Sequence, residues 1–185
     1  MVERMMMTRI SLLLVLTAST VFGCAVQTAD ESSPDYRLPA GTELVLRESL
    51  VVPAGSARVF LQRGAVVAKA RLDYYNPHCN FELREVSDGT ARIEPDVFFI
   101  TRVTVGFEEV VGRELPRYAG VGLPTFDDMR PFITRYVRHD LNSAVQPQVM
   151  RMTCHGGFDD SWWAELPTLN EIRAALGTFA TVQLR

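Results

Sequence analysis

The sequence lacks an excess of positive charge and any long apolar run. Its 19 Lys and Arg residues are outnumbered by 22 Asp and Glu residues, so the formal net charge is −3 at pH 7. Because a surface that binds nucleic acid has to be basic, this balance argues against nucleic acid as the main partner. The longest apolar run, close to the N-terminus, is shorter than the roughly 20 residues that a transmembrane helix needs.

Motifs of common enzyme classes and internal repeats are also missing. The chain of 185 residues contains no Gly-x-Ser-x-Gly elbow, no His-Glu-x-x-His pair and no phosphate-binding glycine loop. No repeat of about 20 to 50 residues is present, which argues against solenoids and propellers. What is present is a hydrophobic content of 47% with 22% charged residues. That composition excludes a disordered chain and, at this length, indicates one domain with a hydrophobic core.

The first 23 residues have the features of a secretory signal. Arg4 and Arg9 precede an apolar run at 10–16, and small or polar residues follow at 17–20. A positive start, a short hydrophobic stretch and a small residue before the cleavage site are typical of export signals. The sequence therefore predicts that residues 1–23 are removed.

The end of this segment, Val21-Phe22-Gly23-Cys24, resembles the lipobox of bacterial lipoproteins, in which an aliphatic residue and two small ones precede a cysteine. Phe22 is larger than the residue usual at its site. The resemblance, which covers residues 1–24, implies that Cys24 receives a diacylglyceryl group and that cleavage and acylation of the new amine follow. Two or three acyl chains give lasting membrane attachment. The alternative is an ordinary signal peptide, cut near Gly23 or Ala29, that leaves Cys24 unmodified.

A short polar segment separates Cys24 from the predicted domain. Residues 24–37 are small or polar and show no apolar periodicity, which indicates a flexible tether. Ala25 follows the cysteine, and in the sorting rule of enterobacterial lipoproteins Asp at that place retains the protein in the inner membrane. The resemblance therefore implies a lipid-anchored protein on the inner leaflet of the outer membrane. Residues 38–185 would form a single β-rich domain in the periplasm.

From Leu38 onward the sequence predicts mainly β structure, because short segments rich in β-branched and aromatic residues alternate with Gly, Pro and Asp-Gly breaks. The expected strands are 42–47, 58–62, 68–75, 80–85, 91–93, 97–107, 132–139, 148–155 and 179–184. Asp88-Gly89 predicts a hairpin between 80–85 and 91–93. The alternation of polar and apolar residues across 67–75 predicts a sheet with one face toward solvent. Residues 108–131 are expected to form a long connection.

One helix is expected, and it begins after Thr168. Thr168 and Glu171 have the spacing of a capping box, and Gly177 follows Leu176 as a stop signal. An apolar stripe along 172–176 would pack the helix on the sheet. The predicted fold class is therefore mainly β (α+β), an antiparallel β-sandwich or open barrel with one C-terminal helix and a final strand.

Cys79 and Cys154 are expected to form a disulfide. An oxidising envelope favours the bond, and strand parity places each sulfur on the same face as apolar neighbours. The alternatives are free thiols or a metal site made by His78-Cys79 and Cys154-His155. Adjacent residues on a strand point to opposite faces, so each of these dipeptides is poorly placed to give both ligands to one ion. No metal or cofactor is therefore expected.

Two arrangements of His and Asp are the candidates for acid–base or nucleophilic chemistry. His139 precedes Asp140, and His155 is followed by Asp159-Asp160-Ser161. A general base has to reach the proton that it removes, and nothing in the sequence brings these groups together. The simpler interpretation is that His139 ends a strand and that the Asp pair lies in a turn.

Trp162 and Trp163 follow that acidic turn directly. Tryptophan beside carboxylates stacks on sugars or holds an apolar ligand, which would suit an envelope protein that meets glycan. The alternative is that one Trp packs in the core and the other shields an edge. The candidate ligand patch therefore comprises His155, Asp159, Asp160, Trp162 and Trp163.

Together these patterns favour a non-catalytic binding or structural module that is attached to the membrane through Cys24. An envelope protein or glycan is the expected partner. Two alternatives stay open. An envelope glycan or peptide hydrolase would require His139 or His155 to share a cleft with Asp159 or Asp160. A carrier of an apolar ligand would require a lined cavity inside a barrel.

Overall fold

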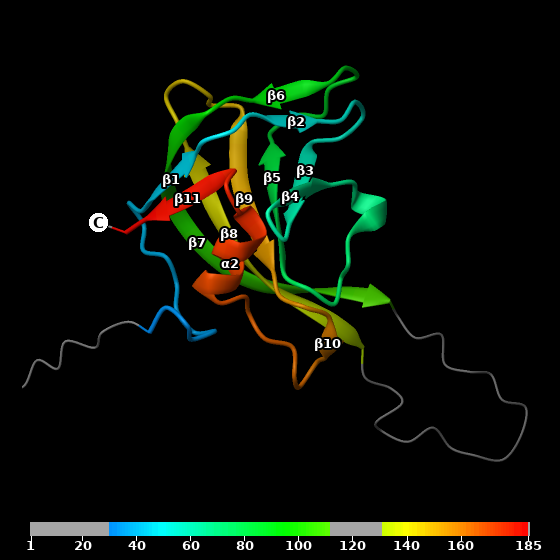
Figure 1. Ribbon diagram of the computed structural model, residues 1–185. Helices are drawn as coiled ribbons and strands as arrows, with labels where there is room; N and C mark the ends of the chain where they lie inside the picture. Colours follow the sequence, from blue (N-terminus) through cyan, green and yellow to red (C-terminus); the bar gives the residue numbers. More distant parts are fainter. Residues whose placement is uncertain (1–29, 112–130, 185) are drawn as a thin grey trace, which may run out of the picture.

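The computed structural model describes residues 30–111 and 131–184, which form a curled antiparallel sheet with a helix at its open side (Figure 1). The strand order is β11-β1-β7-β8-β9-β5-β3-β4, β10 pairs with β8, and β2 and β6 form a separate pair. The elements in chain order are β1 (Glu43–Leu46), β2 (Leu50–Val52), β3 (Arg58–Gln62), β4 (Ala65–Val67), the 3-10 helix η2 (Lys69–Arg71), β5 (His78–Leu83), β6 (Ala91–Ile93), β7 (Asp96–Val111), β8 (Phe132–Asn142), β9 (Val149–His155), β10 (Asp159–Asp160), α2 (Leu169–Leu176) and β11 (Ala180–Gln183).

The predicted fold class, mainly β with one C-terminal helix, is confirmed. The expected strands 58–62 and 91–93 coincide with β3 and β6, and most of the others differ from the observed strands by a few residues at their ends. The prediction of a connection over 108–131 is wrong for its first four residues, because β7 continues to Val111 and stays paired with β8. The remaining positions, 112–130, lie outside the described residues.

The predicted strand at 68–75 is wrong. Lys69–Arg71 form η2, and a turn follows in which the Asn76 amide N–H donates to the Asp73 carbonyl. The side chain of Gln62 explains the difference. Its amide donates to the carbonyls of Asp73 and Asn76, at 2.8 and 3.1 Å, and accepts from the Asp73 N–H at 3.1 Å. One buried side chain thus takes the place of the strand partner that this segment would otherwise need.

The hairpin predicted at Asp88-Gly89 is also wrong. β6 does not pair with β5; it pairs with β2, so that Leu50 lies opposite Ile93. Leu50, Val52 and Ile93 are all fully buried in the core. Because the apolar side chains of β2 and β6 cover the same part of the core, burial selects this longer-range pairing over the local turn.

Helix α2 begins as predicted. Thr168 Oγ1 accepts from the Glu171 N–H at 3.2 Å, and the Glu171 carboxylate accepts from the Thr168 N–H at 2.8 Å. Its buried face, which includes Ile172 and Leu176, contacts β3, β5 and β11. These strands come from both ends of the strand order, so the helix closes the open side of the curled sheet.

The predicted disulfide is confirmed. Cys79 and Cys154 face each other across β5 and β9, with Cα atoms 4.0 Å apart, and both are fully buried in the core. The bond joins neighbouring strands of one sheet and shares its face with Phe81 and Met152. It therefore fixes the register of β5 against β9 as well as their contact.

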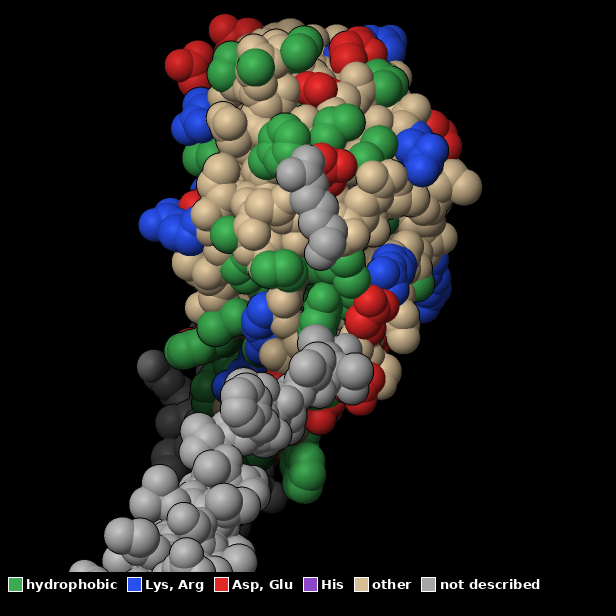
Figure 2. All heavy atoms as spheres, turned by 90° about the vertical axis from the view of Figure 1, so that its left-hand side faces the viewer, with side chains coloured by type: hydrophobic (Ala, Val, Ile, Leu, Met, Phe, Trp, Pro, Cys, Tyr) green, Lys and Arg blue, Asp and Glu red, His purple; other side chains and the backbone are tan. Residues whose placement is uncertain are grey.

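Figure 2 looks at the side of the molecule where β1, β11 and β7 lie in Figure 1. Hydrophobic side chains form small groups near the middle of this face, and charged side chains lie mainly toward its edges. On β7, Val97 and Phe99 are 38% and 39% exposed. Scattered apolar side chains of this kind are normal on a protein surface, so they indicate no binding site by themselves.

Removal of the disulfide is expected to destabilise the domain strongly. The bond joins residues separated by 75 positions, and loss of such a constraint on the unfolded chain lowers the free energy of unfolding by about 4 kcal/mol. Urea unfolding of the oxidised protein and of Cys79→Ala measures this loss. Cys79→Ala combined with Cys154→Ala should lose little more, because the same bond is missing. Additive losses, or a loss below about 1 kcal/mol, would contradict this account.

Candidate functional site

Strands β5 and β9 are buried on both faces, although only one face is apolar. The face opposite the core carries three polar pairs. In register these are His78 with His155, Asn80 with Thr153, and Glu82 with Arg151. All except Arg151 are no more than 9% exposed. Burial of so many polar groups costs free energy unless they bind one another or a ligand. This polar face is therefore a candidate functional site.

Glu82 is held by two arginines. Its carboxylate accepts hydrogen bonds from Arg151 at 2.9 and 3.0 Å, and Arg58 Nε lies 3.2 Å from Oε2. Burial raises the pKa of Glu82, but the hydrogen bonds from Arg151 and Arg58 outweigh it and hold the pKa below its usual value. Two guanidinium groups thus share this carboxylate, and the charges of Glu108 and Asp140 also act on Arg58 and Arg151, respectively.

The two histidines stack on each other one register step beyond the disulfide. The rings of His78 and His155 are 4.7 Å apart and nearly parallel, and Tyr74 meets His78 edge-on. Burial, and after it the charge of His155, lowers the pKa of His78 to about 4. His155 Nε2 lies 3.8 Å from a carboxylate oxygen of Glu108, and this interaction lowers the pKa of Glu108.

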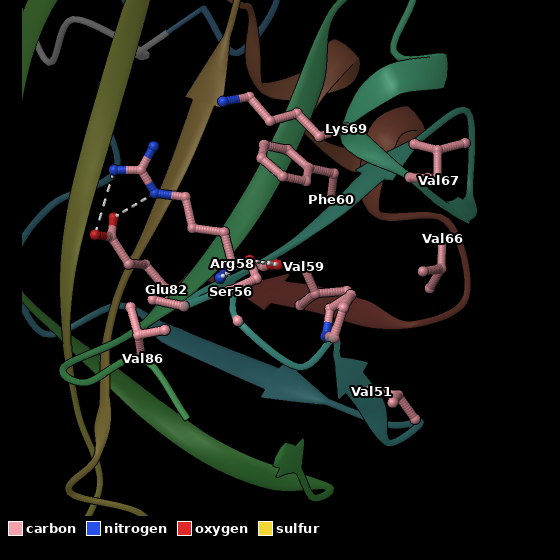
Figure 3. Close-up of a pocket in the computed structure, with 14 residues that line it drawn as sticks. Val51, Ser56, Arg58, Val59, Phe60, Val66, Val67, Lys69, Glu82 and Val86 are labelled. Atoms are coloured by element: carbon pink, nitrogen blue, oxygen red, sulfur yellow. Dashed lines mark hydrogen bonds and ion pairs between the residues drawn. The ribbon is translucent and has the colours of Figure 1, made fainter. Parts of the chain in front are cut away.

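A groove of about 810 Å³ opens beside Glu82 and runs between β2, β3 and β4 (Figure 3). The turn before β3 at 53–57 frames it, and β3 is joined to β4 by a tight turn at Arg63-Gly64, where both residues have positive φ. Apolar side chains form most of its walls: Val51, Val59, Phe60, Val66, Val67 and Val86. The groove is therefore an apolar surface that stays open to solvent.

Two basic residues border the groove on one side. Figure 3 shows Arg58 extending toward Glu82 and Lys69 extending past the ring of Phe60 toward the same side. Lys69 forms no ion pair with any residue that the structure describes. A smaller cleft of about 200 Å³ adjoins the groove, shares Arg58, Phe60 and Lys69 with it, and reaches the two histidines. Glu108 and Glu109 also line this smaller cleft, so the excess of positive charge lies on the groove side, at Arg58 and Lys69.

The structure distributes the candidate patch of His155, Asp159, Asp160, Trp162 and Trp163 over more than one place. His155 lies in the histidine pair, and Asp159 and Asp160 form β10 opposite β8. Trp162 and Trp163 are 73% and 72% exposed, so neither packs in the core. Of the five, Asp159 and Trp163 line a common cleft, and this cleft does not include His155.

The other predicted pairs are also separated. His139 is 1% exposed in the core, whereas Asp140 pairs with Arg102 at 2.7 Å on the opposite face of β8. Neither histidine shares a cleft with Asp159 or Asp160 within the described part of the chain. Cys24 and its predicted modification lie outside the described residues.

Apart from His155, the residues of the groove and the polar face were not predicted from the sequence as a site, although one signal was present. Antiparallel strands pair residues whose numbers have a constant sum. A direct Cys79–Cys154 pair therefore places His78 opposite His155 and Glu82 near Arg151. The disulfide prediction thus implied these contacts, but only if the two strands were immediate neighbours, which parity alone does not establish.

Known proteins give no further guide to the site. Comparison of the chain with protein-family models, with curated proteins and with solved structures yields no match. No described helix is both long and apolar enough to cross a bilayer. Within 30–111 and 131–184, no group of three or more His, Cys, Asp and Glu side chains is placed to hold a metal ion.

Acid is expected to destabilise the fold through its buried histidines. Burial lowers the pKa of His139 to about 4, below the 6.5 of an ordinary histidine. A depressed histidine pKa stabilises the fold fully above pH 6.5, and this contribution is lost as the pH falls toward 4. Each such histidine adds a slope of up to about 1.4 kcal/mol per pH unit in this window. His139→Leu should therefore give a flatter profile of unfolding free energy between pH 6.5 and 5.

Urea unfolding at four or five pH values in this window measures both profiles. His78, whose pKa is also lowered to about 4, keeps part of the slope in the variant, so the expected change is a reduction and not its disappearance. Identical slopes for the two proteins would contradict the burial of a neutral His139.

Proposed function

We propose that this protein is a lipid-anchored, non-catalytic binding module of the bacterial envelope, and that its groove takes an amphipathic ligand with an anionic group. The observation that carries the proposal is the juxtaposition of an apolar groove with Arg58 and Lys69.

The size and lining of the groove support an apolar chain as one part of the ligand. A volume of about 810 Å³ falls within the range of about 300–1,000 Å³ usual for small-molecule sites. Val66 and Val86 are 46% and 63% exposed. Covering their side chains with a hydrocarbon chain would remove apolar surface from water, at about 25 cal/mol per Å².

The charges beside the groove support an anionic headgroup as the other part. Arg58 and Arg151 share the single carboxylate of Glu82, and Lys69 has no acidic partner among the described residues. An anion placed between Arg58 and Lys69 would accept charge-assisted hydrogen bonds from both. Because Glu108 and Glu109 line the adjoining cleft, the site for this anion is on the groove side of the two basic residues.

The alternative of a carrier with a ligand inside the barrel fits this geometry less well. The space between the curled sheet and α2 is filled by buried side chains, among them Leu44, Phe81, Phe98 and Ile172. The groove lies outside this core, between β2, β3 and β4. The ligand that we propose therefore binds on the surface and enters without opening the domain.

Lipidation at Cys24 would keep the groove close to a membrane. Asp30 is the first described residue, and six residues span at most about 21 Å. Glu31 pairs with Arg173 of α2 at 2.6 Å, which ties the start of the domain to the helix. In this proposal the domain sits next to the bilayer on the periplasmic side of the outer membrane, where amphipathic molecules are concentrated.

The groove is tested with laurate as the probe, measured by isothermal titration calorimetry. Residues 25–185 are exported behind the leader of a soluble periplasmic protein, so that the disulfide forms without the lipid. Laurate is expected to bind, and dodecanol, which lacks the charge, is expected to bind more weakly. Lys69→Glu should weaken laurate binding about tenfold, which corresponds to about 1.4 kcal/mol.

A matched pair of variants controls for surface effects. Val66→Asp places a charge on the wall of the groove, whereas Val97→Asp places the same charge on β7, outside it. Val66→Asp should abolish laurate binding and Val97→Asp should leave it unchanged. Equal binding by both variants, or no binding of laurate to the unaltered protein, would refute the proposed ligand class.

The anchor is tested by metabolic labelling with an alkynyl fatty acid. Only a thiol accepts the diacylglyceryl group, so the wild-type protein is expected to carry the label and Cys24→Ser is not. Membrane fractionation of the same cells shows whether the label accompanies attachment. Equal labelling of the two proteins would end the claim of a lipoprotein.

A further inference from the structure

The cleft that Asp159 and Trp163 line is separate from the groove and from the smaller cleft beside the histidines. It lies next to β10 and the start of α2. It has a volume of about 270 Å³, the size of one side chain rather than of an extended ligand. The residues that line it and matter here are Tyr75, Phe158, Asp159, Trp163, Glu165 and Glu171. They come from two segments that are far apart in the sequence, the turn at Tyr75 and residues 158–171, which include β10 and the start of α2.

Two adjacent glycines bring these segments together. A Cβ atom at Gly156 would lie 2.3 Å from the backbone oxygen of Glu165, and one at Gly157 would lie 2.6 Å from that of Tyr75. No residue with a side chain fits at either position without displacing a loop. The Phe158 N–H donates to the Tyr74 carbonyl at 2.8 Å, which fixes the two segments to each other.

Aromatic side chains stand open to solvent on this cleft. Tyr75 and Trp163 are 73% and 72% exposed, although side chains of this size are usually covered. The ring of Phe158 stacks on Tyr74 at 4.9 Å and meets the ring of Tyr75 edge-on at 6.4 Å. The ring of Tyr75 is therefore held by its contact with Phe158, while most of its side chain stays exposed to solvent.

The charge of the cleft has one sign. Asp159, Glu165 and Glu171 are exposed, and none of the described residues that line the cleft is Lys or Arg. The Glu171 carboxylate is occupied by the cap of α2, which leaves Asp159 and Glu165 to face a ligand. An aromatic wall with carboxylates at its rim attracts a cation, because the ring face and the acid both carry negative potential.

We infer that this cleft binds the cationic side chain of an Arg or Lys residue presented by a partner protein. The cation would lie against Trp163 and Tyr75 and pair with Asp159 and Glu165. A neutral glycan could stack on the aromatic side chains, but it carries no positive charge to pair with the carboxylates of the cleft. This inference is independent of the groove, which has the opposite charge and lies on other strands.

The test uses the full-length protein in a neutral polyoxyethylene detergent and follows binding by isothermal titration calorimetry, a readout that the tryptophan variants below do not remove. The probe is the peptide acetyl-Gly-Arg-Gly-amide, compared with its citrulline counterpart, which keeps the shape of arginine without the charge. The arginine peptide is expected to bind and to weaken as salt rises. Chitotriose is the glycan probe, and no binding of it is expected.

The variants separate the cleft from its surroundings. Trp163→Ala should weaken binding of the arginine peptide about tenfold, and Glu165→Gln about threefold. Trp162→Ala is the matched control, because this neighbour is equally exposed but does not line the cleft. It should bind normally, as should Lys69→Glu, because Lys69 lines the groove and the smaller cleft beside the histidines but not this cleft.

Three results would overturn the inference: equal binding of the citrulline peptide, equal losses in Trp162→Ala and Trp163→Ala, or binding of chitotriose in place of the peptide. A negative result with laurate leaves this test unaffected, since the groove and the cleft share no lining residue.

Discussion

The pairing of β5 with β9 is the constraint on which the rest of the molecule depends. Cys79 and Cys154 are bonded directly across these two strands, so the register cannot slip by a residue without breaking a covalent bond. Because side chains alternate along a strand, this single bond assigns one face to the core and the other to the polar pairs. The histidine stack and the Glu82–Arg151 ion pair follow from it by position. An interaction on the apolar face thus determines the chemistry of the opposite face.

The two surfaces proposed as binding sites lie beside the paired strands β5 and β9, and their charges have opposite signs. The groove beside β3 and β4 combines valine side chains with Arg58 and Lys69, whereas the cleft beside β10 combines aromatic rings with Asp159 and Glu165. Each is open to solvent, and of their residues named above only Val59 of the groove also belongs to the core. Under the two proposals, the domain presents one surface for amphipathic anions and another for basic protein segments. Such a division suits a module that brings a ligand and a partner together.

The sequence was sufficient for the class of fold and for its local signals, but not for long-range pairing. The capping box at Thr168 and the parity of Cys79 and Cys154 depend on neighbouring residues, and the structure confirms both the helix and the disulfide. The strand predicted at 68–75 failed because the side chain of Gln62 satisfies the backbone of a turn there. The hairpin at Asp88-Gly89 failed because burial of Leu50 and Ile93 favours another partner. The groove was not predicted, since it is made by turns and strands whose placement depends on these same long-range choices.

The central claim is that the groove between β2, β3 and β4 is a ligand site, and hydrogen–deuterium exchange tests it most directly. Exchange of the intact protein, followed by mass spectrometry with and without saturating laurate, reports each backbone segment separately. The account predicts slower exchange in peptides that cover 51–69 and 82–86, with no change in 156–168 and 43–46. Protection spread evenly over the chain, or confined to segments outside the groove, would contradict it.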